Sequence, residues 1–196
     1  MKKLLSILFV FAVSIGANAQ LSTVKLGANY NAEIIAHKLG KINYPSMDIS
    51  FERALGKKFS INGTYNYSKL QYDLSSDFYS SSHSGYNNYN HALILEGRFY
   101  LTSNTTGLFF QLGIPFTLSI EERFDSSPLF HGTDNRYTYA ISTFGGIGIK
   151  YPLSSRFGLE MNMSMSPSLN FLGVDYGTSG FIKSGIKLFY TFGKSK

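Results

Sequence analysis

The stretch Tyr137–Ser166 reads YTYAISTFGGIGIKYPLSSRFGLEMNMSMS and consists of two alternating runs joined by a turn. In the first run, up to Tyr151, large apolar or aromatic residues hold most odd positions, and small or polar residues hold most even ones. The turn Pro152–Arg156 follows, and the alternation restarts at Phe157. Successive side chains of a β-strand point to opposite faces, so each run has one apolar and one polar face. Each run also has about the length that crosses a bilayer as a tilted strand, roughly 9–11 residues. The stretch therefore predicts a β-hairpin with an apolar face suited to lipid.

The same alternation recurs along the chain and gives eight expected strands, at about 23–35, 45–54, 59–69, 91–101, 107–120, 137–151, 157–166 and 181–193. Long connections are expected at 37–44, 70–90, 121–136 and 167–180, and short ones at 55–58, 102–106 and 152–156. Outer-membrane barrels show this alternation of long external loops and short periplasmic turns. The sequence thus predicts an all-β fold: an eight-stranded antiparallel up-and-down transmembrane β-barrel with short periplasmic turns and long extracellular loops.

One residue disagrees with a closed barrel. Pro115 falls inside an expected strand, where its missing N–H removes a hydrogen bond from the ladder. The nearby Gly113 could allow a β-bulge there, although no other feature of the sequence indicates one.

The N-terminus has the pattern of a secretory signal peptide. Lys2 and Lys3 precede an apolar run from Leu4 to Ile15, and Ala17–Ala19 has the small-x-small form of a cleavage site. The apolar run is too short for a membrane anchor, which needs about 20 residues. We therefore expect a signal peptide at 1–19 and an outer-membrane β-barrel domain at 20–196. Loss of the two lysines lowers the formal net charge from +6 to +4.

The composition supports a barrel and excludes some chemistry. Aromatic residues make up 16% of the chain, slightly more than the 15% that are charged. The chain contains no cysteine, which excludes thiol catalysis, disulfides and thiolate metal sites. The aromatic residues are expected at two heights, as in the aromatic girdles of membrane barrels. One set lies at the turn end: Phe51, Phe59, Phe99, Tyr151, Phe157, Tyr190 and Phe192. The other set lies near the loop end: Tyr30, Tyr65, Tyr67, Tyr137 and Tyr139.

The polar faces of the strands predict a filled interior. Acidic and basic residues occur in comparable number on these faces: Asp48, Glu52, Glu96, Arg98, Lys150, Glu160, Lys183 and Lys187. Eight strands enclose a space that side chains fill, and buried charges require partners. We therefore predict a plugged interior without a solute pore, and an ion pair between Glu160 and Lys187 on adjacent strands.

These features resemble the small eight-stranded outer-membrane barrels of OmpA/OmpX type, especially those of Bacteroidetes-like bacteria. The resemblance rests on the signal peptide, the eight alternating segments and the aromatic final strand Leu188–Phe192. Members of this group usually end on an aromatic residue that the barrel-assembly machinery recognises, whereas Gly193–Lys196 follow Phe192 in this chain. The resemblance implies a place in the outer membrane and contact with its lipid.

The leading functional hypothesis is a structural, surface-exposed barrel whose loops contact lipopolysaccharide or extracellular partners, with no nucleic-acid partner and no cofactor. One alternative is an outer-membrane enzyme that modifies lipid, resembling lipid A acylases or deacylases. His131 with Asp134 and Ser126, or His83 with Ser84 and Asp77, could form its site. Serine-rich loops produce such trios by chance, so the sequence predicts no catalytic, cofactor-binding or metal site.

A second alternative is a soluble periplasmic lipocalin-like barrel with its apolar face inside, because periodicity alone cannot assign the two faces. The glycines of Gly145–Gly148 lack the context of a phosphate-binding loop and are interpreted as relief of crowding within a strand.

Overall fold

The structure, a computed structural model, describes residues 21–35, 41–73, 84–102, 105–125, 133–167 and 179–193. These residues form strands β1 (Ser22–Ile35), β2 (Lys41–Ala54), β3 (Phe59–Asp73), β4 (Ser84–Tyr100), β5 (Gly107–Asp125), β6 (Thr133–Ile141), β7 (Phe144–Pro152), β8 (Phe157–Pro167) and β9 (Ser179–Phe192). The expected signal peptide at 1–19 lies outside the described residues and stays a prediction. Within the described part of the chain, no helix is long and apolar enough to cross a membrane.

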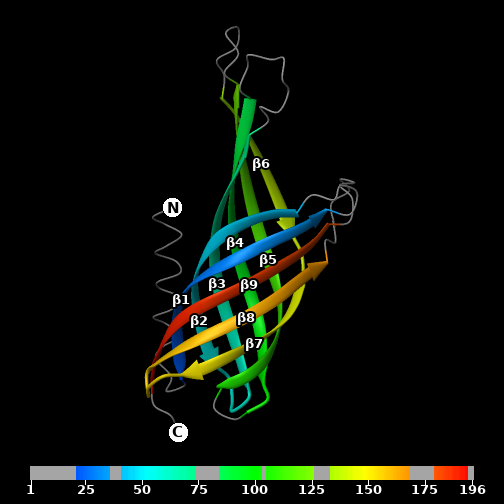
Figure 1. Cartoon of the computed structure of the whole chain (residues 1–196). Helices are drawn as coiled ribbons and strands as arrows, with labels where there is room; N and C mark the ends of the chain where they lie inside the picture. Colours follow the sequence, from blue (N-terminus) through cyan, green and yellow to red (C-terminus); the bar gives the residue numbers. More distant parts are fainter. Residues whose placement is uncertain are drawn as a thin grey trace.

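The strands close into an eight-stranded barrel because β6 and β7 are two parts of one barrel strand. Both pair with β5, β6 through Phe116↔Ile141 and β7 through Gly113↔Phe144. The other strands each pair with the next one in the chain, and β1 pairs with β9 to close the ring. All pairs are antiparallel, and Figure 1 shows the tilted strands around a single interior. The predicted fold is confirmed.

The break between β6 and β7 lies opposite Pro115. The pairs on the two sides of the break advance by three residues along each strand, so the register is unchanged and no extra residue is inserted. The amide of Ser142 donates to the carbonyl of Pro115 at 3.3 Å, but the proline has no N–H with which to donate in return. The bulge that Gly113 could allow is therefore not formed, and the strand accommodates proline by giving up one donor of the ladder, as the sequence predicts.

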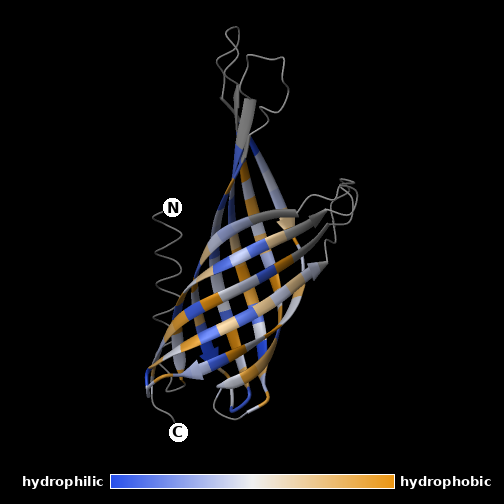
Figure 2. Cartoon of the chain, in the orientation of Figure 1, coloured by the Kyte–Doolittle hydropathy of each residue, from blue (hydrophilic) through white to orange (hydrophobic). Residues whose placement is uncertain are grey.

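The outer and inner faces of the barrel differ in chemistry. Leu112 on the outside of β5 keeps 73% of its surface exposed, whereas Arg98 on the inside of β4 keeps 0%. Figure 2 shows this alternation of hydropathy along the tilted strands. Buried hydrophobic side chains among the described residues are Ala92, Tyr100, Phe109 and Phe189, and the other buried side chains are polar or charged. The apolar face thus points outward, which contradicts the lipocalin-like alternative.

The turn end of the barrel is compact. The amide of Leu55 donates to the carbonyl of Phe59 at 2.8 Å, and the amide of Leu153 donates to the carbonyl of Phe157, also at 2.8 Å. The turns β2–β3 and β7–β8 therefore close with the same hydrogen bond. Because β1 begins and β9 ends at this end, the described chain starts and finishes on the side of the short turns.

The strands extend further toward the loops than the sequence predicts. β2 begins at Lys41, so the first expected loop reduces to residues 36–40, and β3 and β4 continue to leave only 74–83 between them. In the same way β5 ends at Asp125 and β6 begins at Thr133, and the last connection is 168–178. The sequence pattern missed these extensions because apolar alternation ends where lipid would end, whereas backbone pairing continues with polar side chains.

Aromatic rings form contacts around the turn end. Phe59 and Phe99 lie 5.2 Å apart between ring centroids, Phe157 and Tyr190 lie 4.9 Å apart, and Phe51 also contacts a ring on β9. The first two pairs join neighbouring strands and the contact of Phe51 on β2 with Phe192 on β9 reaches across β1, as expected for a girdle. The tyrosines predicted near the loop end are also described, and Tyr137 and Tyr139 are strongly exposed.

Candidate functional site in the barrel interior

The turn-side half of the interior holds six charged side chains, which we call the ion cluster: Lys25, Glu52, Glu96, Arg98, Lys150 and Glu160. All six are buried. They reach the interior from β1, β2, β4, β7 and β8, because each occupies an inward position of its strand. The cluster therefore connects opposite walls of the barrel.

Arg98 is the centre of the ion cluster. Its Nη1 donates to both carboxylate oxygens of Glu160 at 2.9 Å. Its Nε and Nη2 donate to Oε2 of Glu96 at 3.1 and 2.9 Å. The guanidinium also lies over the ring of Phe109, 4.7 Å from its centroid. One arginine thus joins two carboxylates and covers an aromatic face, which suits its planar and delocalised charge.

Glu52 organises the other side of the cluster. Its Oε2 lies 2.6 Å from Nζ of Lys25 and 2.9 Å from Nζ of Lys150. Its Oε1 accepts hydrogen bonds from Ser60 and Tyr100, both at 2.5 Å. The carboxylate is therefore satisfied on both oxygens, as burial requires.

The remaining bonds complete the cluster. Lys25 also lies 2.5 Å from Oε2 of Glu160, and Oε1 of Glu96 accepts from Asn62 at 2.8 Å and from Thr64 at 3.0 Å. Three cations thus face three carboxylates. No charge of the cluster is left without an opposite one, which is the condition under which buried ions are tolerated.

Large rings fill the rest of the turn-side half, and glycines make room for them. Phe109 pairs across strands with Gly148, and a Cβ on that glycine would overlap the ring. Phe189 pairs with Gly158 in the same way. Lys150 lies over the Phe189 ring, 4.9 Å from its centroid. The interpretation of Gly148 as relief of crowding is confirmed.

A second charged group, the Asp48 group, contains Asp48, Lys183 and Lys187. Nζ of Lys183 donates to both oxygens of Asp48 at 3.1 Å, and Nζ of Lys187 lies 2.9 Å from Oδ2. Asn66 donates to Oδ1 at 2.5 Å. Two lysines of β9 therefore share one carboxylate of β2 across β1, which lies between these two strands.

The predicted direct pair of Glu160 and Lys187 is wrong. The two residues are register partners on β8 and β9, but Glu160 bonds to Arg98 and Lys25, and Lys187 bonds to Asp48. Both side chains point into the barrel, where partners on distant strands are closer than the partner on the adjacent strand.

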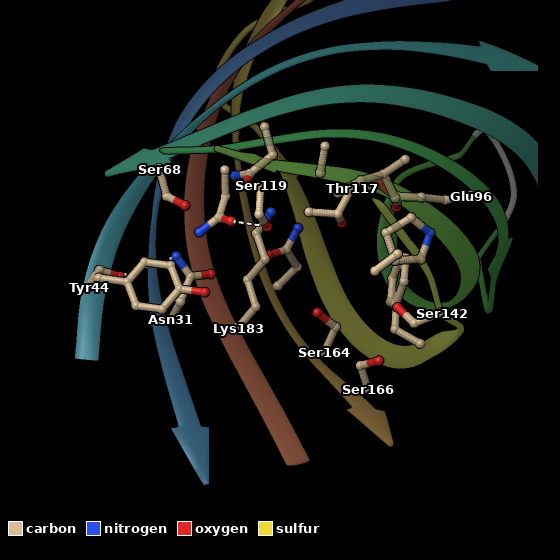
Figure 3. A pocket seen from close by; sticks show the side chains of 18 of the residues that line it. Asn31, Tyr44, Ser68, Glu96, Thr117, Ser119, Ser142, Ser164, Ser166 and Lys183 are labelled. Carbon is tan, nitrogen blue, oxygen red and sulfur yellow. Dashed lines mark hydrogen bonds between the residues drawn. The ribbon is translucent and has the colours of Figure 1, made fainter. Parts of the chain in front are cut away.

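A cavity of about 400 Å³ occupies the loop-side half of the interior. We call it the loop-side cavity. Figure 3 shows the side chains that line it, including Ser164, Ser166 and Lys183. Glu96 and Lys187 line it at its turn-side end, so the ion cluster and the Asp48 group form its floor. The interior is thus divided into a filled half and a half with open space.

All eight charged residues that the sequence placed inside lie inside: Asp48, Glu52, Glu96, Arg98, Lys150, Glu160, Lys183 and Lys187. The sequence analysis missed Lys25, although alternation puts it on the polar face of its strand. It also missed Tyr100, Phe109 and Phe189, because a period-2 pattern gives no reason to place a ring on the polar face. Large residues opposite glycines were the signal that could have found two of them.

Of the four histidines, His91 lies within the described residues, on β4 near the loop end. Its Nδ1 lies 2.7 Å from the hydroxyl of Tyr65, and its ring lies 5.2 Å from that of Tyr67. Nothing in these contacts makes it a catalytic base. The predicted histidine trios are not tested, because His83, Asp77, His131 and Ser126 lie outside the described residues. In the described ranges, no three histidine, aspartate or glutamate side chains could hold a metal ion.

No protein-family model matches the chain, and no curated protein matches it. Solved structures do. The chain resembles the attachment invasion locus protein Ail of Yersinia pestis in complex with the heparin analogue sucrose octasulfate, with a TM-score of 0.60 and 11% identity over 89% of this chain and 100% of that one. It also resembles the translocator domain of the autotransporter NalP from Neisseria meningitidis, with a TM-score of 0.50 and 11% identity over 96% and 95% of the two chains. Ail is an outer membrane protein. At these identities the likeness concerns the fold.

Proposed function

We propose that this protein is a structural, surface-exposed barrel of the outer membrane with a non-conducting interior. The observation that carries the proposal is the inversion of ordinary burial, with exposed leucine, isoleucine and methionine outside and paired charges inside. An apolar outer band with aromatic residues at its edge matches a bilayer. The fold shared with Ail supports the same location.

The ion cluster supports a plugged interior. It links β1, β2, β4, β7 and β8 through charge-assisted bonds of 2.5–3.1 Å, and Phe109, Phe189 and Tyr100 fill the space around it. Moving an ion through this level would require the separation of several buried pairs, each costly to break. We therefore propose that solutes do not pass through the barrel.

The loop end supports a role in surface contact. In Figure 1 the strands β4, β5 and β6 rise above the remaining wall. β4 has 17 residues and β5 has 19, against 11 in β8. The extension carries polar side chains such as Asn87, Asn88 and Glu122, which suit water rather than lipid. We propose that this extension and the loops contact lipopolysaccharide or extracellular partners.

The proposal includes the route to the membrane. We expect the leader at 1–19 to direct export and the barrel-assembly machinery to recognise the aromatic final strand, which ends at Phe192. Among the described residues, His91 contacts tyrosines rather than an acid or a serine, so it gives no support to a lipid-modifying enzyme. Comparison of lipid A masses with and without the gene tests that alternative.

The first experiment locates the protein and tests its resistance to detergent. We expect it in the outer-membrane fraction, as a compact gel band that shifts on boiling. Recovery in the soluble periplasm without a shift would contradict the proposal.

The second experiment measures conductance in planar bilayers. The wild-type protein should give no stable conductance steps, whereas an Arg98→Ala variant that retains the heat-dependent shift should conduct more. Stable and uniform steps from the wild-type protein would show that the interior is a pore.

A further inference from the structure

The loop-side cavity has a closed floor and a defined wall. Residues from all nine strands line it, together with Ser142 in the break between β6 and β7. The ion cluster and the rings lie on the turn side of it, so any occupant would enter from the loop side. Its volume of about 400 Å³ falls within the range of small-molecule sites, roughly 300–1,000 Å³.

The lining of the cavity is mostly neutral and rich in hydrogen-bonding groups. The amides come from Asn31, Asn66, Asn88, Asn90, Gln111 and Asn162. The hydroxyls come from Tyr44, Ser68, Thr117, Ser119, Ser142, Ser164 and Ser166. The charged groups at its floor already have opposite partners, Lys183 and Lys187 on Asp48 and Glu96 on Arg98. Figure 3 shows hydroxyl groups on several sides of the same space.

Two acceptors of the lining lack a partner. Gln111 is only 3% exposed, and its Oε1 is buried without a hydrogen bond. Oδ1 of Asn88 also lacks a hydrogen bond, but Asn88 lies ten residues along β4 from Arg98, the register partner of Gln111, so roughly 30 Å separates the two acceptors. A buried acceptor without a donor is costly. An anion brings no donor to these oxygens, whereas a hydroxyl group does.

Apolar side chains complete the wall. Phe144 lies over Gly113, where a Cβ would overlap its ring, and this position brings the ring into the lining of the cavity. Ile94, Ala92 and Pro115 add apolar surface nearby. Sugars present both hydroxyl groups and apolar C–H faces, so a wall of amides, hydroxyls and one ring matches them.

We propose that the loop-side cavity binds a neutral polyhydroxylated solute of about mono- or disaccharide size. Oε1 of Gln111 accepts a hydrogen bond from one of its hydroxyl groups, and Phe144, the register partner of Gly113 at the next inward position of β5, packs against a C–H face. This binding site goes beyond the structural role proposed above. The solute reaches the cavity either as a free sugar or as the end of a longer glycan.

The test uses the full protein, extracted in detergent micelles and labelled for NMR. The probes are trehalose as a free neutral disaccharide, a dextran as a longer glycan and sodium sulfate as an anion. We expect trehalose to shift the signals of the cavity residues in a saturable way. Saturation with dextran alone would assign the site to a glycan end and keep the proposed chemistry.

Variants localise the site. Gln111→Ala removes an orphan acceptor and should weaken trehalose binding about twofold to tenfold, the contribution of one hydrogen bond. Gln71→Ala, on the exposed outer face of β3, is the matched control and should change nothing. Ser142→Phe should fill the cavity and abolish binding. Heat-dependent gel mobility verifies that each variant is folded.

Three results would overturn the proposal. A folded protein that shows no saturable shift with trehalose or dextran holds only solvent in the cavity. Saturation with sulfate but not with either sugar assigns an anion site near Lys183 instead. Unchanged trehalose binding in a folded Ser142→Phe variant places the sugar elsewhere. If Gln111→Ala does not fold, two results still test the proposal: which NMR signals of the wild-type protein shift with trehalose, and whether Ser142→Phe binds it.

Discussion

The two halves of the barrel interior differ in how their buried polar and charged side chains are satisfied. In the turn-side half, three cations face three carboxylates, and rings fill the remaining space. In the loop-side half, neutral amides and hydroxyls surround a cavity of about 400 Å³, while amide oxygens without a partner occur in both halves, on Asn62 beside the ion cluster and on Asn88 at the cavity. Charged groups bring their partners close, because an unpaired buried ion costs far more than an unpaired amide. Neutral polar groups tolerate open space.

Strand β8 shows the change of chemistry within a few residues. Its inward positions run from Glu160 in the ion cluster through Asn162 to Ser164 and Ser166 at the cavity. On β1 the inward positions change in the same sense, from Lys25 to Asn31. On β1 and β8, the division between the two halves therefore follows from the residues at the inward positions.

The largest expected effect comes from removing a charge of the filled half. Glu160→Ala leaves Arg98 and Lys25 without one of their carboxylates and should lower the free energy of unfolding by about 3–5 kcal/mol. The matched control is Ser164→Ala, two inward positions along the same strand, which should change it by less than about 0.5 kcal/mol. Denaturant unfolding in lipid vesicles, followed by circular dichroism, measures both. Equal losses in the two variants would remove the distinction between the halves.

A smaller loss is expected from crowding the filled half. A Cβ at Gly148 would overlap the ring of Phe109, which supports Arg98. Gly148→Ala should therefore destabilise the barrel by about 1–3 kcal/mol, the usual cost of overpacking. Gly63→Ala on the outer face is the control, because nothing lies within 4 Å of the added carbon. The same unfolding measurement applies, and a neutral Gly148→Ala would show that the turn-side half contains unused space.

The smallest effect is expected at the wall of the cavity. Pro115→Ala supplies a donor toward Ser142, worth about 0.5–1.5 kcal/mol, and loses the rigidity of proline, worth about 0.4–1 kcal/mol. The net change in stability should stay below about 1 kcal/mol. Hydrogen exchange should show a new protected amide at position 115 that joins β6 to β7. Rapid exchange of that amide would mean that the break has a cause other than the missing N–H.

Much of the fold follows from the sequence because alternation is a local property. The eight strands, their antiparallel order and the inward position of Asp48 or Glu160 all follow from which residues alternate and where the turns lie. Strand ends were placed less well, as at Lys41 and Asp125, because pairing continues beyond the apolar pattern. The ladder hydrogen bond lost at Pro115 was predicted, whereas the break between β6 and β7 opposite it was not, because it depends on pairing with another strand.

The sequence by itself determined the number of barrel strands and the face on which each charged side chain lies. Only the tertiary structure decided which charges meet. Glu160 on β8 binds Arg98 on β4 and Lys25 on β1, and Lys150 on β7 binds Glu52 on β2. The physical reason is that alternation determines to which face of its strand a side chain points. Which opposite charge it then meets depends on distances across the interior of the closed barrel. Those distances exist only once the ring is closed.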